Sequence, residues 1–540
     1  MRLLEIVFLA SLVLTGLALF FPPPRRASLL RYWAAVPVAL ALVHLLIDHG
    51  RWQLFAAYAL AGLIAIAAIV AANMAAGASA SASASAAASG TANAARRDGQ
   101  IVARGRRLVR WLGGLVILAV SGLSIAAASL VPFFELPAPT GSYKIGNRWL
   151  YLVDSSRTET LAPSPGGPRA LVVRVWYPAD SVAGSADRYI SRQVAQAIAH
   201  SIKLPTFAFT HLTNVTTHAY PLAWIPSTPQ RLPLLLFSHG YAAGTESQNT
   251  VQMEELASHG FVVASIDHPY EAGGVIVPPD STLIPANPPF QPFDTTEMKA
   301  MMATMDRIKG ARDTAQVVGP IREILAQGAV LDTAADRWLA DTRFVLDRLT
   351  TMSSPHAGSD TLLVGRLATD AVGIFGMSFG GATAANFCTV DPRCVAGMNL
   401  DGLHYGVASR SPLPRPFFIA SSQGNPNVHR LFYERAQAPA WLMVTSGAEH
   451  MDYTDFGWFA PWLGAKGGML GGIAAPRMHA LMNAIVVPWF DAALRGGPPL
   501  DARALAARFP EITIEYRDGT PPVAPAAAMA APAALRPARR

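Results

Sequence analysis

The sequence GIFGMSFGGATAANF, at residues 373 to 387 of this 540-residue chain, carries the strongest indication of its fold. A short apolar run leads into a helical pattern through the motif G-M-S-F-G at 376 to 380. A serine on a sharp turn between a strand and a helix needs glycine two positions away on each side, because side chains there would collide with the turn and the neighbouring strand. The motif predicts a nucleophilic Ser378 with Gly376 and Gly380 as elbow glycines. The alternative is a chance match, which the flanking patterns oppose.

Short β-branched runs that end in turn signals surround this motif and alternate with helical patterns. The runs are ALVVRVWYP (170 to 178), PLLLFSHG (233 to 240), FVVASIDH (261 to 268), AVGIFG (371 to 376), VAGMNLDG (395 to 402) and WLMVTSG (441 to 447). Helical patterns lie near 251 to 258, over 335 to 349 and from Gly380 onward. Continuous apolar strands are typical of a sheet covered on both faces. The sequence therefore predicts an α/β fold, a mostly parallel sheet with helices on both faces.

A serine hydroxyl is a weak nucleophile until an oriented base takes its proton. His450 directly follows the predicted strand at 441 to 447, in the turn GAEH, and is the predicted base. Three other histidines follow the serine. His479 lies in a helical run, His429 lies in a polar stretch with no predicted strand before it, and His404 is too close to the predicted acid to face it across a site.

The predicted acid is Asp401, which directly follows the apolar strand VAGMNL. Functional groups gather at the carboxyl ends of parallel strands. Asp391 lies in the turn TVDPR and more plausibly shapes that turn, while Asp452 and Asp455 follow the base too closely. We expect Asp401 to fix the imidazole tautomer and to stabilise the imidazolium.

A tetrahedral oxyanion needs two backbone donors near the serine. One predicted donor is the N–H of Phe379, and the other is the N–H of Tyr241 in the turn after the early strand at 233 to 240. Gly240 lets that backbone bend close. His239 beside it is interpreted as a brace for the loop, with a catalytic base as the alternative.

These segments resemble one family. PLLLFSHGYAAG, ELASHGFVVASIDH, ADTRFVLDRL, GIFGMSFGGATAANF, AGMNLDG and the histidine of GAEHMDYTDF appear in order over about residues 140 to 515. They are similar to plasma and intracellular type II platelet-activating factor acetylhydrolases and their bacterial relatives, of the α/β-hydrolase superfamily. The resemblance places the family's triad on Ser378, Asp401 and His450. It implies calcium-independent serine lipases that cleave short or oxidised acyl esters. Met377 departs from the histidine that the family often has there.

The first quarter of the chain is apolar. Overall, 51% of residues are apolar and only 15% are charged, well below the usual charged share of a soluble domain. Apolar stretches occupy Leu3 to Phe21, Tyr32 to Ile47, Leu54 to Met74 and Leu112 to Phe134, and the sequence predicts about four transmembrane helices. The family pattern does not include this block.

Arginines set the expected orientation, since cytoplasmic loops collect Lys and Arg. They concentrate in the first connection (Arg25, Arg26, Arg31) and in the third (Arg96, Arg97, Arg104, Arg106, Arg107, Arg110). We therefore expect a multi-pass protein of a bacterial-type inner or plasma membrane with an extracytoplasmic catalytic domain. The net charge of +7 comes largely from such clusters, which argues against a nucleic-acid partner.

The expected domains are a membrane block at 1 to 136 with a flexible Ala/Ser-rich linker at 75 to 95, a hydrolase domain at 137 to 518, and a disordered tail at 519 to 540. A lid insertion with a Met-rich segment is predicted at 272 to 328, with ordinary helix packing as the alternative. Cys388 and Cys394 are a candidate disulfide if the domain lies outside the cytoplasm, and buried thiols otherwise.

The leading hypothesis is a membrane-anchored carboxylic ester hydrolase, acting through an acyl-serine on short-acyl lipid or phospholipid esters. A general carboxylesterase or polyester hydrolase is the alternative. A membrane sensor or interaction protein with a disused hydrolase domain is the alternative of another class. The expected partners are an ester substrate and a membrane. No metal site and no cofactor are predicted, because no His/Cys/Glu cluster or nucleotide loop has suitable spacing.

Overall fold

The computed structural model describes residues 2–21, 27–48, 50–85, 92–130, 134–201, 203–221, 223–226, 231–277, 281–286, 296–327, 329–354, 363–424, 426–459, 461, 465 and 467–519. The chain divides into two compact units, Met1–Phe133 and Phe134–Arg540. Each unit is described by itself. Of the predicted tail at 519 to 540, residues 520 to 540 lie outside the described residues.

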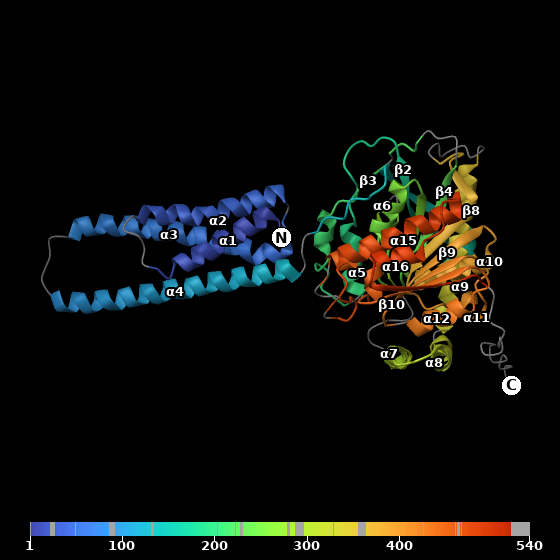
Figure 1. Ribbon diagram of the computed structural model, residues 1–540. Coiled ribbons are helices and arrows are strands. Elements are labelled where there is room, and N and C mark those ends of the chain that lie inside the picture. The colour runs from blue at the N-terminus through green and yellow to red at the C-terminus, as the bar shows by residue number, and fades with distance from the viewer. Residues whose placement is uncertain are drawn as a thin grey trace. The chain divides into compact units, whose positions relative to one another are not determined.

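The N-terminal unit consists of helices. They are α1 (Leu3–Ala18), α2 (Ala27–Ile47), α3 (Phe55–Ser85) and α4 (Ala92–Leu130), with the short 3-10 helix η1 (Trp52–Leu54) before α3 (Figure 1). Two of its segments are long and apolar enough to cross a membrane, Trp52–Ala71 with mean hydropathy 2.5 and Ala103–Leu130 with mean hydropathy 2.0. Leu3–Ala18 and Trp33–Ile47 are apolar but shorter.

The Ala/Ser-rich segment differs from the prediction of a flexible linker. Helix α3 continues through Ser85, and α4 begins at Ala92, so only residues 86 to 91 of this segment lie outside the described residues. Alanine has the highest intrinsic helix propensity, and a long helix that is already nucleated extends at little cost. The linker prediction weighed only the lack of apolar surface and was wrong for 75 to 85 and for 92 to 95.

The C-terminal unit is built on a ten-stranded sheet with the order β12-β11-β10-β9-β8-β4-β5-β2-β1-β3. Its strands are β1 (Lys144–Thr158), β2 (Pro168–Ala179), β3 (Ala219–Pro221), β4 (Leu232–Ser238), β5 (Val262–Asp267), β8 (Leu367–Met377), β9 (Cys394–Leu400), β10 (Phe417–Ser422), β11 (Ala440–Thr445) and β12 (Ile512–Arg517). The strands from β11 to β5 run parallel. Strand β12 pairs antiparallel with β11, β2 pairs antiparallel with both β5 and β1, and β3 pairs parallel with β1.

Helices cover both faces of the sheet (Figure 1). Alternate residues of each central strand enter different cores: Leu234 and Leu236 of β4 pack in one, Leu235 and Phe237 in the other. The first core includes α9 (Ala329–Ser353), α10 (Phe379–Val390) and α12 (Pro426–Glu434). The second includes α6 (Thr250–Ser258), α15 (Ala475–Arg495) and α16 (Ala502–Arg508). This is the α/β-hydrolase arrangement that the sequence predicts.

All six predicted strands and all three predicted helices are present in the structure. The sequence interpretation missed β1, β3, β10 and β12 of the ten-stranded sheet. The described residues within 272 to 328 form the hairpin β6 (Gly274–Val277) and β7 (Thr282–Pro285) and the helices α7 (Thr296–Lys309) and α8 (Thr314–Gln327). Met305 packs partly buried against the first core, which agrees with ordinary helix packing at that position.

Candidate active site

The turn between β8 and α10 holds Ser378 in a strained conformation. Its φ is 55° and its ψ is −118°, a region that residues other than glycine rarely occupy. The glycines on either side are required by space. A Cβ on Gly376 would lie 2.1 Å from the carbonyl oxygen of Gly380, and a Cβ on Gly380 would lie 1.8 Å from that of Ser238. The turn is fixed by the N–H of Ser378, which donates to the carbonyl of Leu400 at 2.8 Å.

The structure brings the three predicted catalytic side chains together from three loops. His450 Nε2 lies 3.0 Å from Ser378 Oγ, and His450 Nδ1 lies 2.8 Å from Asp401 Oδ2. The other oxygen, Asp401 Oδ1, accepts the N–H of Ser422 at 2.7 Å. Burial opposes ionisation of Asp401, but the His450 hydrogen bond and charge outweigh it and lower the pKa of the carboxyl. An ionised Asp401 favours the tautomer with a proton on Nδ1, which leaves Nε2 to accept from the serine.

A tight turn positions His450. The 3-10 helix η3 (His450–Tyr453) begins there, and the N–H of Glu449 donates to Asp452 Oδ2 at 2.7 Å. The same oxygen accepts the N–H of Gly471 at 2.7 Å. Asp452, which the sequence analysis rejected as the catalytic acid, therefore stabilises the loop that carries His450.

The loop after β4 lies against the serine turn. A Cβ on Gly240 would lie 3.5 Å from Met377 Sδ, and the N–H of Gly240 donates to Gln248 Oε1 at 2.7 Å. The ring centroids of Tyr241 and Phe379 are 5.3 Å apart. The two residues that carry the predicted oxyanion donors are therefore neighbours in space. Within the described part of the chain, neither of these two N–H groups donates to a protein acceptor. Both are free for an oxyanion.

The remaining histidines lie apart from Ser378 Oγ. His404 is fully buried beside the Phe432 ring, and in the described residues its two nitrogens have no hydrogen-bond partner. His479 contacts Asn483 in α15, as expected for a packing residue. For His429 the interpretation was wrong, because β10 precedes it; it is buried in α12, with Nδ1 3.8 Å from Asp401 Oδ1.

His239 contacts the backbone of its own loop. Its Nδ1 lies 2.7 Å from the carbonyl oxygen of Gly240, and the side chain is fully buried. This geometry fits the brace interpretation and leaves no path to a substrate. Cys388 and Cys394 are joined by a disulfide at the end of α10 and the start of β9.

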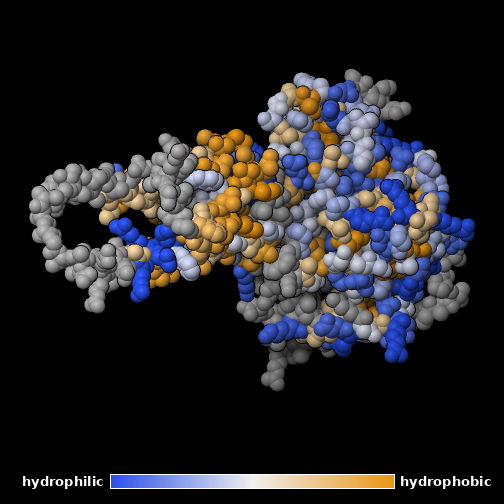
Figure 2. Space-filling view, turned by 60° about the vertical axis from the view of Figure 1, so that its left-hand side comes forward, coloured by the Kyte–Doolittle hydropathy of each residue, from blue (hydrophilic) through white to orange (hydrophobic). Residues whose placement is uncertain are grey.

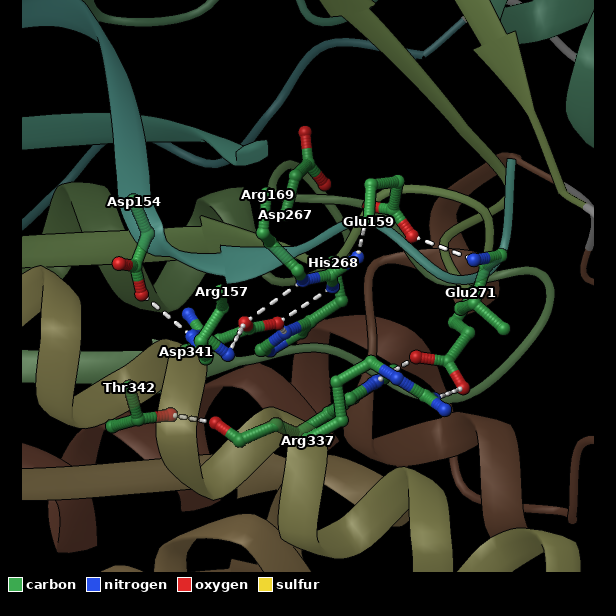
Figure 3. Close-up of polar contacts among 12 residues, drawn as sticks. Asp154, Arg157, Glu159, Arg169, Asp267, His268, Glu271, Arg337, Asp341 and Thr342 are labelled. Atoms are coloured by element: carbon green, nitrogen blue, oxygen red, sulfur yellow. Dashed lines mark hydrogen bonds and ion pairs between the residues drawn. The ribbon is translucent and has the colours of Figure 1, made fainter. Parts of the chain in front are cut away.

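Sequence reasoning missed a buried charged cluster beside this loop. Asp341 of α9 binds Arg157 and Arg169 at 2.7 Å each and lies 2.9 Å from His268 Nδ1 (Figure 3). His268 Nε2 lies 3.1 Å from Ser238 Oγ. These residues lie on β1, β2, the end of β5 and α9, and no sequence spacing links them. Among the described residues, no group of three His, Cys, Asp or Glu side chains is arranged to hold a metal.

Known proteins match parts of this chain. The family model described as "Platelet-activating factor acetylhydrolase, isoform II" matches residues 131–275. The chain is 24% identical over 237 residues to a platelet-activating factor acetylhydrolase of Cavia porcellus, covering 42% of this chain and 50% of the relative. These similarities support an α/β-hydrolase family that resembles the platelet-activating factor acetylhydrolases.

The chain also resembles a solved esterase. A ferulic acid esterase from Streptomyces cinnamoneus superposes with a TM-score of 0.54 at 26% identity, over 71% of this chain and 99% of the esterase. The chain spans about half the length of its curated relative. The matched family segment contains the oxyanion loop and His268 but ends before Ser378. Together these similarities support a carboxylic ester hydrolase.

Proposed function

We propose that this protein is a serine carboxylic ester hydrolase that works through an acyl-enzyme on Ser378. The observation that carries the proposal is the position of His450, whose two ring nitrogens reach Ser378 Oγ and Asp401 Oδ2 at 3.0 and 2.8 Å. Ser378 is only partly buried, so an ester can approach its hydroxyl.

In the proposed reaction, His450 Nε2 takes the serine proton while Ser378 Oγ attacks the ester carbonyl carbon. The oxyanion that forms accepts the N–H groups of Tyr241 and Phe379. The imidazolium, stabilised by Asp401, then gives its proton to the leaving alcohol and the C–O bond breaks. Water, deprotonated by the same imidazole, attacks the acyl-serine and releases the acid.

We propose short-acyl lipid or phospholipid esters as the substrate class. The acetylhydrolase names of the matching family and relative support it. A general carboxylesterase acting on other small esters or polyesters is the second candidate, and the ferulic acid esterase neighbour favours it. A membrane sensor with a disused hydrolase domain is the rival of another class, and the assembled Ser378, His450 and Asp401 argue against it.

We further propose that the N-terminal helices anchor the protein in a membrane, with the hydrolase domain extracytoplasmic. Large apolar side chains are exposed along these helices, where Figure 2 shows orange surface. Leu63, Ile66, Leu115 and Leu123 are among them. An apolar exposed face of this kind is stable in lipid. The boundaries of the predicted domains, near 136 and 518, belong to the same proposal. An alkaline-phosphatase fusion after residue 140 tests the orientation, and an inactive fusion contradicts it.

The test of activity uses the full chain, purified in mild detergent, beside its Ser378→Ala variant. Both are assayed on p-nitrophenyl esters of rising acyl length and on a phospholipid with a short sn-2 acyl group. We expect hydrolysis by the wild type and a loss of about 10⁴-fold or more in the variant. A folded wild type without activity on every ester would favour the sensor hypothesis.

A further inference from the structure

The peptide bond between Gly240 and Tyr241 sets the direction of the proposed oxyanion donor. A peptide unit is planar and trans, so its C=O and its N–H point in opposite directions. Whatever holds the Gly240 carbonyl therefore aims the Tyr241 N–H. His239 Nδ1 lies 2.7 Å from that carbonyl oxygen, and a neighbouring histidine ring is thus the group that holds it.

His239 must carry its proton on Nδ1 to do this. The backbone N–H of His268 points at His239 Nε2 at 3.3 Å, which makes Nε2 the acceptor and leaves Nδ1 as the donor. Burial and the nearby His268 lower the pKa of His239 to about 3, so the ring is neutral at ordinary pH. Asp267 Oδ1 lies 3.7 Å from Nε2, beyond hydrogen-bond distance.

Helix α9 holds the two histidine rings in place. Trp338 stacks on His268 with centroids 3.8 Å apart and planes 8° apart, and its edge meets His239 at 4.9 Å. One turn further along the helix, Asp341 accepts from His268 Nδ1 (Figure 3). The position of the His268 backbone, and with it the tautomer of His239, therefore depends on a helix more than 60 residues away in sequence.

The far side of Tyr241 is held as well. The N–H of Ala242 donates to the carbonyl of Glu271 at 2.8 Å, and Ala242 has a φ of 68°, in the left-handed region. The Glu271 carboxylate accepts from Trp338 Nε1 at 2.9 Å and from Arg337 (Figure 3). The same helix therefore braces both flanks of Tyr241.

We infer that His239 is a positioning residue of the oxyanion hole: its Nδ1–H fixes the Gly240 carbonyl and turns the Tyr241 N–H toward the oxyanion, while Trp338 and Asp341 of α9 hold it in register through His268. This inference rests on the proposed hydrolase function. It assigns His239 a role in the transition state rather than in substrate binding.

The test compares two isosteric variants of the full-length protein. In His239→Asn the amide nitrogen takes the place of Nδ1 and keeps the donor to Gly240, whereas in His239→Gln the amide takes the place of Nε2 and that donor is lost. We expect His239→Gln to lower kcat about 100-fold with little change in KM, as for loss of one oxyanion donor. His239→Asn should stay within about 10-fold of the wild type.

A transition-state readout separates positioning from general damage. A trifluoromethyl ketone adds to the serine and forms a stable oxyanion in the same hole. Its inhibition constant should rise in His239→Gln by about the factor lost in kcat/KM, and should change little in His239→Asn. Equal kcat losses in both variants with an unchanged inhibition constant would overturn the inference.

Two controls keep the outcomes distinct. Wild type and Ser378→Ala are assayed in parallel, and an inactive wild type rejects the proposed function rather than this inference. If melting curves show that His239→Gln does not fold, Trp338→Phe takes its place, because it retains an aromatic ring against His268 and removes the N–H that holds Glu271. We then expect a smaller kcat loss, about 10-fold, again with a matching rise in the inhibition constant; no change in either quantity contradicts the inference.

Discussion

The domain contains two Asp–His–Ser arrangements with nearly the same geometry. In one, His450 lies 2.8 Å from Asp401 and 3.0 Å from Ser378; in the other, His268 lies 2.9 Å from Asp341 and 3.1 Å from Ser238. The pairing is the same in both, with Nδ1 toward the carboxylate and Nε2 toward the hydroxyl. Ser378, Asp401 and His450 all follow parallel strands, whereas in the second arrangement Ser238 and His268 lie at strand ends and Asp341 lies on α9.

The two arrangements differ in access. The His450 side chain is 41% exposed, whereas His268 and Ser238 are completely buried and Trp338 covers one face of the His268 ring. Ser378 also stands on a strained turn with positive φ, whereas Ser238 ends an ordinary strand. Hydrogen-bond distances between Asp, His and Ser are therefore not enough to make a serine a nucleophile. In the proposed function the exposed set exchanges protons with a substrate, and the buried set supports the loop that carries the predicted oxyanion donor Tyr241.

We expect the largest effect from a substitution that disrupts the exposed Ser378–His450–Asp401 arrangement. His450→Ala removes the base, and we expect kcat to fall by about 10⁴-fold or more on p-nitrophenyl acetate. His404→Ala is the matched control, since it also removes a histidine after the serine but lies away from Ser378, and it should keep kcat within about 10-fold. The reverse ranking would overturn the assignment of the base.

Asp401→Asn sharpens the role of the carboxylate. The amide no longer favours the Nδ1–H tautomer or stabilises the imidazolium, so we expect kcat to fall about 10³- to 10⁴-fold while KM changes little. Steady-state kinetics with circular dichroism as a folding check measures it. A kcat near that of the wild type would show that another group orients His450.

Asp341→Asn tests the buried counterpart, where we expect the main effect on stability. The substitution leaves Arg157, Arg169 and His268 without their shared carboxylate, and loss of one partner of a buried ion pair costs about 3–5 kcal/mol. Denaturant unfolding measures it. Asp347→Asn on the same helix is the control: its side chain is 63% exposed and its ion pair with Arg393 should contribute less than about 1 kcal/mol.

Acid should destabilise the domain through its buried histidines. Burial lowers the pKa of His268 to about 4, despite its bond to Asp341, and burial lowers that of His404 to about 3. The unfolded chain, with histidine pKa near 6.5, therefore binds more protons. The free energy of unfolding is therefore highest above about pH 6.5. As the pH falls from there to the folded pKa of each histidine, it decreases by about 1.4 kcal/mol per pH unit and histidine.

His404→Leu isolates one share of this dependence, the smallest of the expected effects. Because His404 has no hydrogen-bond partner among the described residues, stability at pH 7 should change little. Between pH 6 and 4 the free energy of unfolding should depend less steeply on pH, by about one proton. An unchanged slope would mean that His404 does not titrate on unfolding.

The sequence carried the parts of the fold that local pattern encodes. The glycines around Ser378 are required by contacts within a few residues, and the apolar runs that became β4, β5, β8, β9 and β11 end at turn signals. Chain order then put Asp401 after β9 and His450 after β11, and the structure brings both to the serine. Their catalytic roles remain predictions that the variants above test.

Tertiary structure decided what local pattern could not. Strand β10 was missed because its six apolar and small residues follow a proline-rich segment. Because the strand was missed, the burial of His429 was missed as well. The Ala/Ser segment was predicted to be a flexible linker because it cannot form an apolar core, but helix α3 continues through it to Ser85, as its helix propensity favours. The first outcome depended on the pairing of β10 with β9 and β11, and the second on a local propensity that the prediction had not weighed.

The sequence by itself determined the α/β fold, the serine turn and the order of the three predicted catalytic residues, because each depends on spacing along one strand or turn. Only the tertiary structure decided which Asp–His–Ser set is exposed, and that α9 packs against the histidines beside the loop after β4. Burial and long-range charge pairing arise when β1, β2, β5 and α9 pack together, and no property of any one segment specifies that packing.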